Sequence, residues 1–153
     1  AKSLNLDTSV ILAGRKRNDS MPKFIVKKLF HKIKERGLQN ITNLKILILG
    51  VTFKENCSDV RNSKSIEIIR ILRKFEPTIH VYDPLALLND LEKKEFKLIN
   101  RPKKSYYDII ILSVPHDKII KKGIKYIEQL SKNSYIFFDL KSSFSKKYSD
   151  YSM

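Results

Sequence analysis

Apolar and amphipathic stretches alternate along most of this chain. Five short apolar runs predict strands, at residues 44–49, 78–82, 96–99, 109–114 and 135–138. Between them, apolar residues that recur every three or four positions predict helices, at about residues 63–75, 85–94 and 119–130, the last interrupted at Gly123. Strands that alternate with helices in this way are typical of a mostly parallel sheet covered by helices on both faces. We therefore predict an α/β protein with a Rossmann-like, three-layer α/β/α fold.

The first 40 residues depart from this pattern, because they predict helix with no strand before it. Apolar positions recur through residues 3–36, and the capping residues Asn18-Asp19-Ser20 stand just before Pro22, which favours a helix start there. The segment is therefore either two helices or one long helix kinked at Pro22, and Gly37 closes it. We expect this long helix to pack on another domain or another subunit.

These patterns divide the chain into three parts. Residues 1–40 form a helical arm, residues 41–145 form the α/β domain, and the polar residues 146–153 are expected to fray. A length of 153 residues with 42% apolar composition suits one domain with a hydrophobic core and an appendage. No apolar run is long enough to span a membrane, and the first residues do not resemble a signal peptide.

Three polar loops follow strands of the predicted sheet, at residues 50–63, 113–117 and 139–143. In open parallel sheets, ligands bind outside the carboxyl ends of the strands, so we expect these loops to converge on one edge. Neither a dinucleotide-binding G-x-G-x-x-G loop nor a phosphate-binding Walker loop can be written anywhere, because the four glycines lie far apart. Any phosphate must therefore be bound by side chains.

Candidate anion-binding side chains stand in the first and last of these loops. Lys54 offers a point charge and Arg61 a bidentate fork, both before a helix N-terminus that also favours anions. The alternative is that Lys54 is simply solvated and Arg61 pairs locally with Asp59. Asp59 either orients Arg61 or serves, with Ser63, only as a helix cap. Lys141 is a third cation expected at the same edge.

Histidine and cysteine contribute less to the predicted chemistry. His116 follows a strand and is a candidate acid/base group, but the only nearby carboxylate in sequence is Asp117, which favours a structural histidine. The single cysteine, Cys57, lacks an evident base and is interpreted as incidental. One cysteine allows no internal disulfide, which fits a cytoplasmic protein, and the three histidines are not spaced as a metal site.

The net charge of +15, from 31 basic and 16 acidic residues, suits two classes of partner. Excess Lys and Arg is the electrostatic signature of nucleic-acid binding. However, the lysines are spread along the chain on the polar faces of predicted helices, and a small polyanionic substrate fits the same charge. We expect neither a nucleic-acid nor a membrane partner.

Several of these motifs together resemble a known family. The run GVTFKENCSDVRNSKS from Gly50, followed by VYDPLA, SVPHD and FDLK, resembles the carboxyl-terminal half of the UDP-glucose/GDP-mannose dehydrogenase family, as does the upstream AGRKRNDSMP. It is most similar to the bacterial branch that oxidises UDP-N-acetylhexosamines to uronic acids for surface polysaccharides such as capsule and O-antigen. The resemblance covers nearly the whole chain, and its most specific part is Phe-Lys followed by Asp-x-Arg-x-Ser.

The resemblance implies a division of roles. Residues 41–145 correspond to the UDP-binding domain, and residues 1–40 to the end of a central helix that forms a homodimer. Phe53, Lys54 and Lys141 are implied to contact the UDP-sugar, and Arg61 is implied to reach an NAD held by the protein's own N-terminal domain.

The implied reaction is two hydride transfers to NAD that take a C6 alcohol to a carboxylate. A cysteine holds the intermediate as a thiohemiacetal and then a thioester. That cysteine belongs to a G-F-G-G-x-C motif, which this sequence lacks, and Cys57 does not occupy its place. We therefore expect a fragment of the dehydrogenase that contains no catalytic residue and is inactive alone.

Two rival interpretations remain at this stage. A stand-alone module of receiver type would need acidic residues after the first strand, where Gly50-Val51-Thr52 supplies none. A nucleotide- or nucleic-acid-binding α/β module without catalysis would present a basic face with interleaved aromatic residues.

Overall fold

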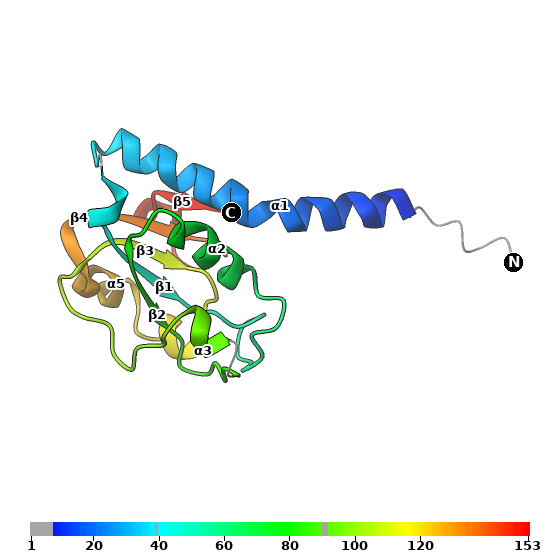
Figure 1. Ribbon diagram of the computed structural model, residues 1–153. Coiled ribbons are helices and arrows are strands. Elements are labelled where there is room, and N and C mark those ends of the chain that lie inside the picture. Colours follow the sequence, from blue (N-terminus) through cyan, green and yellow to red (C-terminus); the bar gives the residue numbers. More distant parts are fainter. Residues whose placement is uncertain (1–7, 39, 90–91) are drawn as a thin grey trace, which may run out of the picture.

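A five-stranded sheet organises the protein in this computed structural model, which describes residues 8–38, 40–89 and 92–153 (Figure 1). All strands are parallel and lie in the order β2-β1-β3-β4-β5. Their bounds are Lys45–Leu49 for β1, Thr78–Tyr82 for β2, Tyr107–Leu112 for β3, Ser131–Asp139 for β4 and Tyr151–Ser152 for β5. The predicted parallel sheet is therefore confirmed.

Helices cover both faces of this sheet, as predicted. The α-helices are α1 (Thr8–Glu35), α2 (Lys64–Arg73), α3 (Glu92–Glu95), α4 (Asp117–Ile120) and α5 (Ile124–Leu130), and the short 3₁₀ helices are η1 (Ile41–Asn43) and η2 (Lys146–Tyr148). Apolar residues of α1 and α2 pack on one face, and those of α4 and α5 pack on the other. Gly123, with φ of +72°, separates α4 from α5 at the predicted interruption.

The central strands β1 and β3 are mostly apolar because both of their faces are buried. In β1, Ile46 and Ile48 point to the α1/α2 face, whereas Leu47 and Leu49 point to the α4/α5 face. β3 is buried at every position and is apolar over residues 109–112, as expected for a central parallel strand. This two-sided core fixes the register of the strands, and with it the edge at which their loops meet.

The first helix is continuous, with Pro22 inside it, so the interpretation as a single long helix holds over the described part. Its last residue is Glu35, and Gly37, which has φ of +70°, lies just beyond it. The Gly37 amide donates to the carbonyl of Lys34, and the Leu38 amide donates to that of Ile33, both at 3.0 Å. This is the glycine-based helix ending that the sequence predicted. Residues 3–7 of the predicted helix lie outside the described residues.

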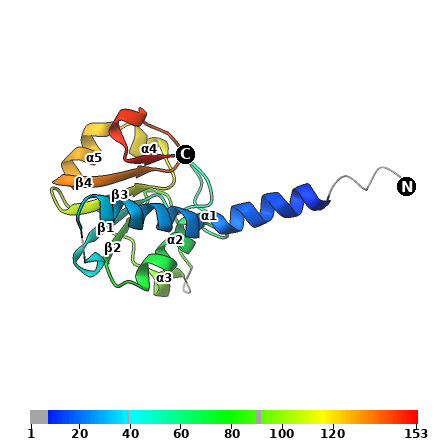
Figure 2. The same ribbon diagram turned by 90° about the horizontal axis from the view of Figure 1, so that it is seen from above.

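Only the first half of α1 projects away from the sheet, as Figures 1 and 2 show from two directions. In the second half, Ile25, Val26, Leu29 and Ile33 are at most 4% exposed and belong to the core on the α2 face. The expectation that the whole arm packs on another body therefore needs correction. Since α2 has only 10 residues, α1 supplies the remaining cover of that face.

The link from β2 to β3 is less regular than predicted. Instead of a helix over 85–94, the described residues contain only α3. The amides of Leu85 and Ala86 donate to the Asp83 carboxylate, and the amide of Leu87 donates to the carbonyl of Ser58, so these residues do not form helical hydrogen bonds. The weak strand predicted at 96–99 is reduced to one bridge between Leu98 and β2.

The tail, expected to fray, instead forms η2 and β5 and adds a fifth strand to the sheet. Asp150 anchors it. Its backbone amide donates to the carbonyl of Phe137 at 2.8 Å, its carboxylate accepts from the Phe137 amide at 2.9 Å, and Arg36 pairs with the same carboxylate at 2.6 Å. The polar composition of the tail led to the wrong prediction, because it does not show that Asp150 bonds to the backbone of β4. None of the helices within the described residues combines the length and apolar character needed to cross a bilayer.

Candidate functional site

The strand order creates a crevice between the ends of β1 and β3. The chain leaves β1 toward β2 on one side and leaves β3 toward β4 on the other, and such a divergence is where ligands bind in open α/β sheets. A pocket of about 300 Å³ lies here, lined by Phe53 and Lys54 after β1, Ser113 after β3 and Lys141 after β4. The predicted convergence of the three loops is confirmed. We call this the switch-point pocket.

Gly50 allows β1 and β3 to approach closely at this edge. It has φ of +82°, and a Cβ there would lie 2.2 Å from the Val114 carbonyl oxygen. The space that the glycine leaves is thus filled by the protein's own backbone. It does not give a ligand phosphate the close backbone approach that a dinucleotide-binding glycine loop provides.

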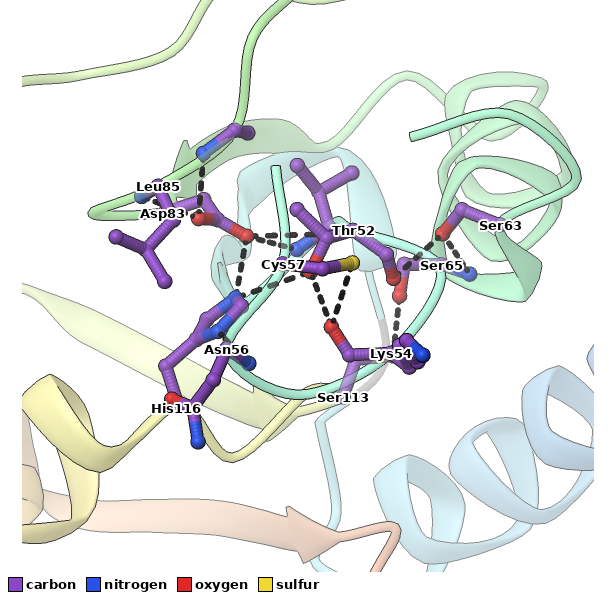
Figure 3. Close-up of polar contacts among 12 residues, drawn as sticks. Thr52, Lys54, Asn56, Cys57, Ser63, Ser65, Asp83, Leu85, Ser113 and His116 are labelled. Carbon is purple, nitrogen blue, oxygen red and sulfur yellow. Dashed lines mark hydrogen bonds and ion pairs between the residues drawn. The ribbon is translucent and has the colours of Figure 1, made fainter. Parts of the chain in front are cut away.

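The Asp83 carboxylate, which follows β2, ties the ends of β1, β2 and β3 together (Figure 3). Its oxygens accept hydrogen bonds from the neighbouring loops, namely the amides of Val51 (2.7 Å) and Thr52 (3.3 Å) and the His116 imidazole (2.9 Å). They also accept from its own loop, at the amides of Leu85 (2.8 Å) and Ala86 (2.9 Å). Burial raises the pKa of Asp83, but the hydrogen bonds from His116 and the backbone outweigh it and lower the pKa overall. The carboxylate therefore stays ionised and anchors the loop after β1.

That loop contains a tight turn, residues 52–57, which we call the Lys54 turn. The carbonyl of Lys54 accepts from the Thr52 hydroxyl at 3.0 Å and from the Cys57 thiol at 3.2 Å, and the Phe53 amide donates to Asp59 at 2.7 Å. The backbone of Lys54 is held in this way, while its side chain and that of Phe53, which is 60% exposed, remain open to a ligand. Cys57 serves the turn as a donor.

Arg61 does not line the switch-point pocket. It pairs with Asp59 through a bond of 2.9 Å from Nε and one of 2.7 Å from Nη2, the local pairing that was the alternative interpretation. This hydrogen-bonded pair lowers the pKa of Asp59 to about 2. Arg61 lines a separate hollow of about 330 Å³ between the loop, α2 and the residues around α3.

Hydroxyl groups complete the floor of the switch-point pocket. Ser63 caps α2 as predicted, accepting from the Ser65 amide at 3.2 Å, and its hydroxyl also donates to the Thr52 carbonyl. The Ser65 and Ser113 hydroxyls lie 2.6 Å apart, and both residues line the pocket. Sequence reasoning did not predict this pair, although Ser113 stands directly after an apolar strand, where site residues are expected.

His116 is fully buried and its ring is hydrogen-bonded on both sides, so the prediction of a structural histidine is confirmed. Its carboxylate partner is Asp83 from the neighbouring loop, not the adjacent Asp117 that the sequence suggested. The sequence spacing of residues 83 and 116 does not predict this contact. It forms because β1 pairs with both β2 and β3, which brings the loops after those two strands together.

The pocket is suited to binding an anion. Lys54 and Lys141 bring exposed cations from two different strand ends, and Phe53 adds an exposed aromatic ring. Lys64 at the rim pairs with Glu67 and with Asp19 of α1, and the hydrogen bond that it donates to Glu67 raises its pKa. Among the described residues that line the pocket there is no histidine or cysteine.

Known proteins are similar to this chain in sequence and in fold. UDP-N-acetyl-D-glucosamine 6-dehydrogenase of Pseudomonas aeruginosa is 33% identical over 142 residues, covering 92% of this chain and 33% of that protein. UDP-N-acetyl-D-mannosamine dehydrogenase of Methanococcus aeolicus is 30% identical over 140 residues, covering 90% of this chain and 30% of that protein. This chain thus spans about a third of the curated relatives it matches.

The fold matches as well. The structure of an NDP-N-acetyl-D-galactosaminuronic acid dehydrogenase from Methanosarcina mazei superimposes with a TM-score of 0.77 at 18% identity, covering 90% of this chain and 28% of that one. The family model for the UDP-binding domain matches residues 47–146, which include all three loops of the switch-point pocket. The chain therefore belongs to the UDP-glucose/GDP-mannose dehydrogenase family and corresponds to its UDP-binding domain.

Proposed function

We propose that this domain binds the UDP part of a UDP-sugar in the switch-point pocket. The observation that carries the proposal is the meeting of Lys54 and Lys141, from the ends of β1 and β4, beside the exposed ring of Phe53. Two cations suit a diphosphate, and an aromatic ring suits a base or sugar face. The Ser65 and Ser113 hydroxyls offer hydrogen bonds at the pocket floor.

In the whole protein, we propose that this domain serves an NAD-dependent UDP-sugar 6-dehydrogenase that makes a uronic acid for surface polysaccharides. Relatives named for UDP-N-acetyl-D-glucosamine and UDP-N-acetyl-D-mannosamine both match this chain, at 33% and 30% identity, so the substrate is proposed to be a UDP-N-acetylhexosamine. Discrimination between these sugars is then expected outside this domain.

NAD does not fit the described residues by themselves. The close approach at Gly50 is filled by Val114, and the Arg61 guanidinium is paired with Asp59 outside the switch-point pocket. We propose that NAD is held mainly by another domain of the whole protein and that Arg61 reaches it from the rim. The chain studied is then inactive alone, and NAD with UDP-sugars should produce no NADH absorbance.

The projecting first half of α1 is proposed to form a homodimer. The second half is already used by the core, so the contact is expected within the segment before Met21. Molar mass by light scattering tests this, with a monomer at all concentrations as the contrary result.

Calorimetric titration with UDP tests the binding proposal. Wild type should bind, and Lys54→Ala and Lys141→Ala should each weaken binding by about 10- to 100-fold, since a hydrogen bond to a charged group contributes about 1.5–3 kcal/mol. Lys118→Ala is the matched control, because Lys118 is an exposed lysine of α4 that does not line the pocket. Equal losses in all three variants would show only a general charge effect.

An oligonucleotide competitor distinguishes the rival function. Binding of nucleic acid through the overall charge would weaken steeply with salt and would respond equally to loss of any surface lysine. Tighter binding of an unrelated oligonucleotide than of UDP would overturn the proposal.

A further inference from the structure

A buried histidine stands directly behind the proposed site without touching the pocket. His116 has no exposed surface, and it lies between the end of β3 and the Lys54 turn. Its Nδ1 is 3.0 Å from the Asn56 amide nitrogen, and its Nε2 is 2.9 Å from Asp83 Oδ2 and 3.1 Å from Thr52 Oγ1 (Figure 3).

These partners define the protonation state of the ring. The Asn56 amide can only donate, so Nδ1 must accept and carries no proton. The Asp83 carboxylate can only accept, so Nε2 carries the proton and donates it. His116 is therefore the neutral Nε2–H tautomer. A second proton at Nδ1 would face the Asn56 N–H and break that bond.

Asn56 completes a staple between the turn and the start of α4. Its φ of +57° is a left-handed conformation that asparagine tolerates better than most residues. Its amide donates to His116, and its side-chain Oδ1 accepts from the Asp117 amide at 3.0 Å. Two hydrogen bonds thus fasten the end of the Lys54 turn to the β3–α4 junction, while Thr52 fastens its start to Asp83.

We propose that His116 is a positioning residue, whose neutral Nε2–H tautomer clamps the end of the Lys54 turn through Asn56 and thereby directs Lys54 toward the anionic ligand. The inference rests on the proposed function, in which Lys54 binds UDP. It assigns to His116 no contact with substrate. Its effect on binding passes through Asn56 to the backbone of Lys54.

Two variants separate the two halves of this clamp. His116→Asn places an amide oxygen near the position of Nδ1 and keeps the acceptor for the Asn56 amide, but it does not reach Asp83. His116→Gln places an amide nitrogen near the position of Nε2 and keeps a donor for Asp83, but it leaves the Asn56 amide without an acceptor. A purely structural role predicts that UDP affinity follows thermal stability in both.

UDP dissociation constants, melting temperatures and amide hydrogen exchange at Asn56 are measured for all three proteins. We expect His116→Gln to raise the Kd for UDP by about tenfold or more and to speed exchange at Asn56. We expect His116→Asn to keep the Kd within about threefold of wild type, even if its melting temperature is lower. Equal UDP affinity in His116→Gln, or losses in both variants that track stability, would overturn the inference.

A measurement on wild type does not depend on the folding of any variant. The ¹⁵N chemical shifts of the His116 ring report its tautomer, and the Nε2–H form is expected at neutral pH. The Nδ1–H form or the imidazolium would overturn the inference. If wild type binds no UDP, the proposed function fails, whereas the tautomer and the Asn56 exchange still decide whether the clamp exists.

Discussion

Replacing Asp83 with Asn tests whether one carboxylate holds the strand ends together. The change preserves the size and shape of the side chain, but it exchanges one acceptor oxygen for an NH₂ group that only donates. Both carboxylate oxygens are in use, since Oδ2 accepts from Val51, Thr52 and His116 and Oδ1 accepts from Leu85 and Ala86. Whichever way the amide turns, at least two donors lose their acceptor.

The expected loss follows from the less costly orientation, in which the NH₂ group faces Leu85 and Ala86. These two hydrogen bonds are only partly buried. Leaving a buried donor unsatisfied costs about 1–3 kcal/mol, so the lower end applies to each, and the bonds that remain lose their charge. We expect the free energy of unfolding to fall by about 2–4 kcal/mol. For a chain of this size, the melting temperature should fall by about 5–15 °C.

Urea unfolding at pH 7, followed by circular dichroism, measures this loss. Asp59→Asn is the matched control, because it makes the same chemical change at an exposed carboxylate that pairs with Arg61, and it should leave stability unchanged. A loss below about 0.5 kcal/mol in Asp83→Asn, or equal losses in both variants, would refute the role assigned to Asp83.

Comparing wild type with Asp83→Asn at different pH values tests the same role. The folded state lowers the pKa of Asp83 below its ordinary 3.8. Its contribution is therefore fully present above the unfolded pKa and is lost as the pH falls through the folded value. The stability difference between wild type and Asp83→Asn should stay constant from about pH 7 to about pH 5 and shrink below about pH 4. A difference that grows on acidification would indicate a carboxyl that is protonated at neutral pH.

Two further substitutions test the packing that builds the site. Gly50→Ala forces a Cβ against the Val114 carbonyl and should lower the free energy of unfolding by about 2–5 kcal/mol. Gly37→Ala is the control, because Gly37 also has a positive φ but a Cβ there would meet no atom within 4 Å. It should lower the free energy of unfolding by only about 1–2 kcal/mol in the same urea assay. Leu29→Ala, at a fully buried position of α1, should lower the free energy of unfolding by about 2–5 kcal/mol, whereas Lys27→Ala, at an exposed position, should leave it almost unchanged. If Leu29→Ala had no effect on stability, the second half of α1 would not be part of the core.

The central strands were predictable because burial on both faces leaves a short, unbroken apolar run, at residues 46–49 of β1 and 109–112 of β3. The predicted strand at 78–82 coincides with β2, and the predicted run at 44–49 differs from β1 by one residue. The caps were predictable for a similar reason, since Ser63 and Gly37 act on backbone groups only a few residues away. Loop convergence followed from the parallel sheet alone.

Contacts between distant residues were not predictable in this way. Sequence reasoning did not single out Asp83 as a site residue, because its partner His116 lies 33 positions away and meets it only once β1 separates β2 from β3. The tail was interpreted as frayed because its composition is polar, yet Asp150 uses that polarity to bond the backbone of β4. Polar residues that are satisfied by distant backbone groups cannot be distinguished in sequence from polar residues that are solvated.

Lys54 and Arg61, the two cations of the first loop, show how a backbone held by hydrogen bonds determines where a flexible side chain can reach. Lys54 and Arg61 are separated by seven positions, yet they line different hollows. Lys54 lies in a turn whose backbone is bonded to Thr52 and Cys57, and Arg61 lies beyond Asp59, which holds its guanidinium. A lysine side chain has enough rotamer freedom to miss a ligand, so fixing its backbone reduces the conformational entropy lost on binding. The buried Asp83 and His116 network behind the turn is therefore expected to influence ligand affinity as well as stability.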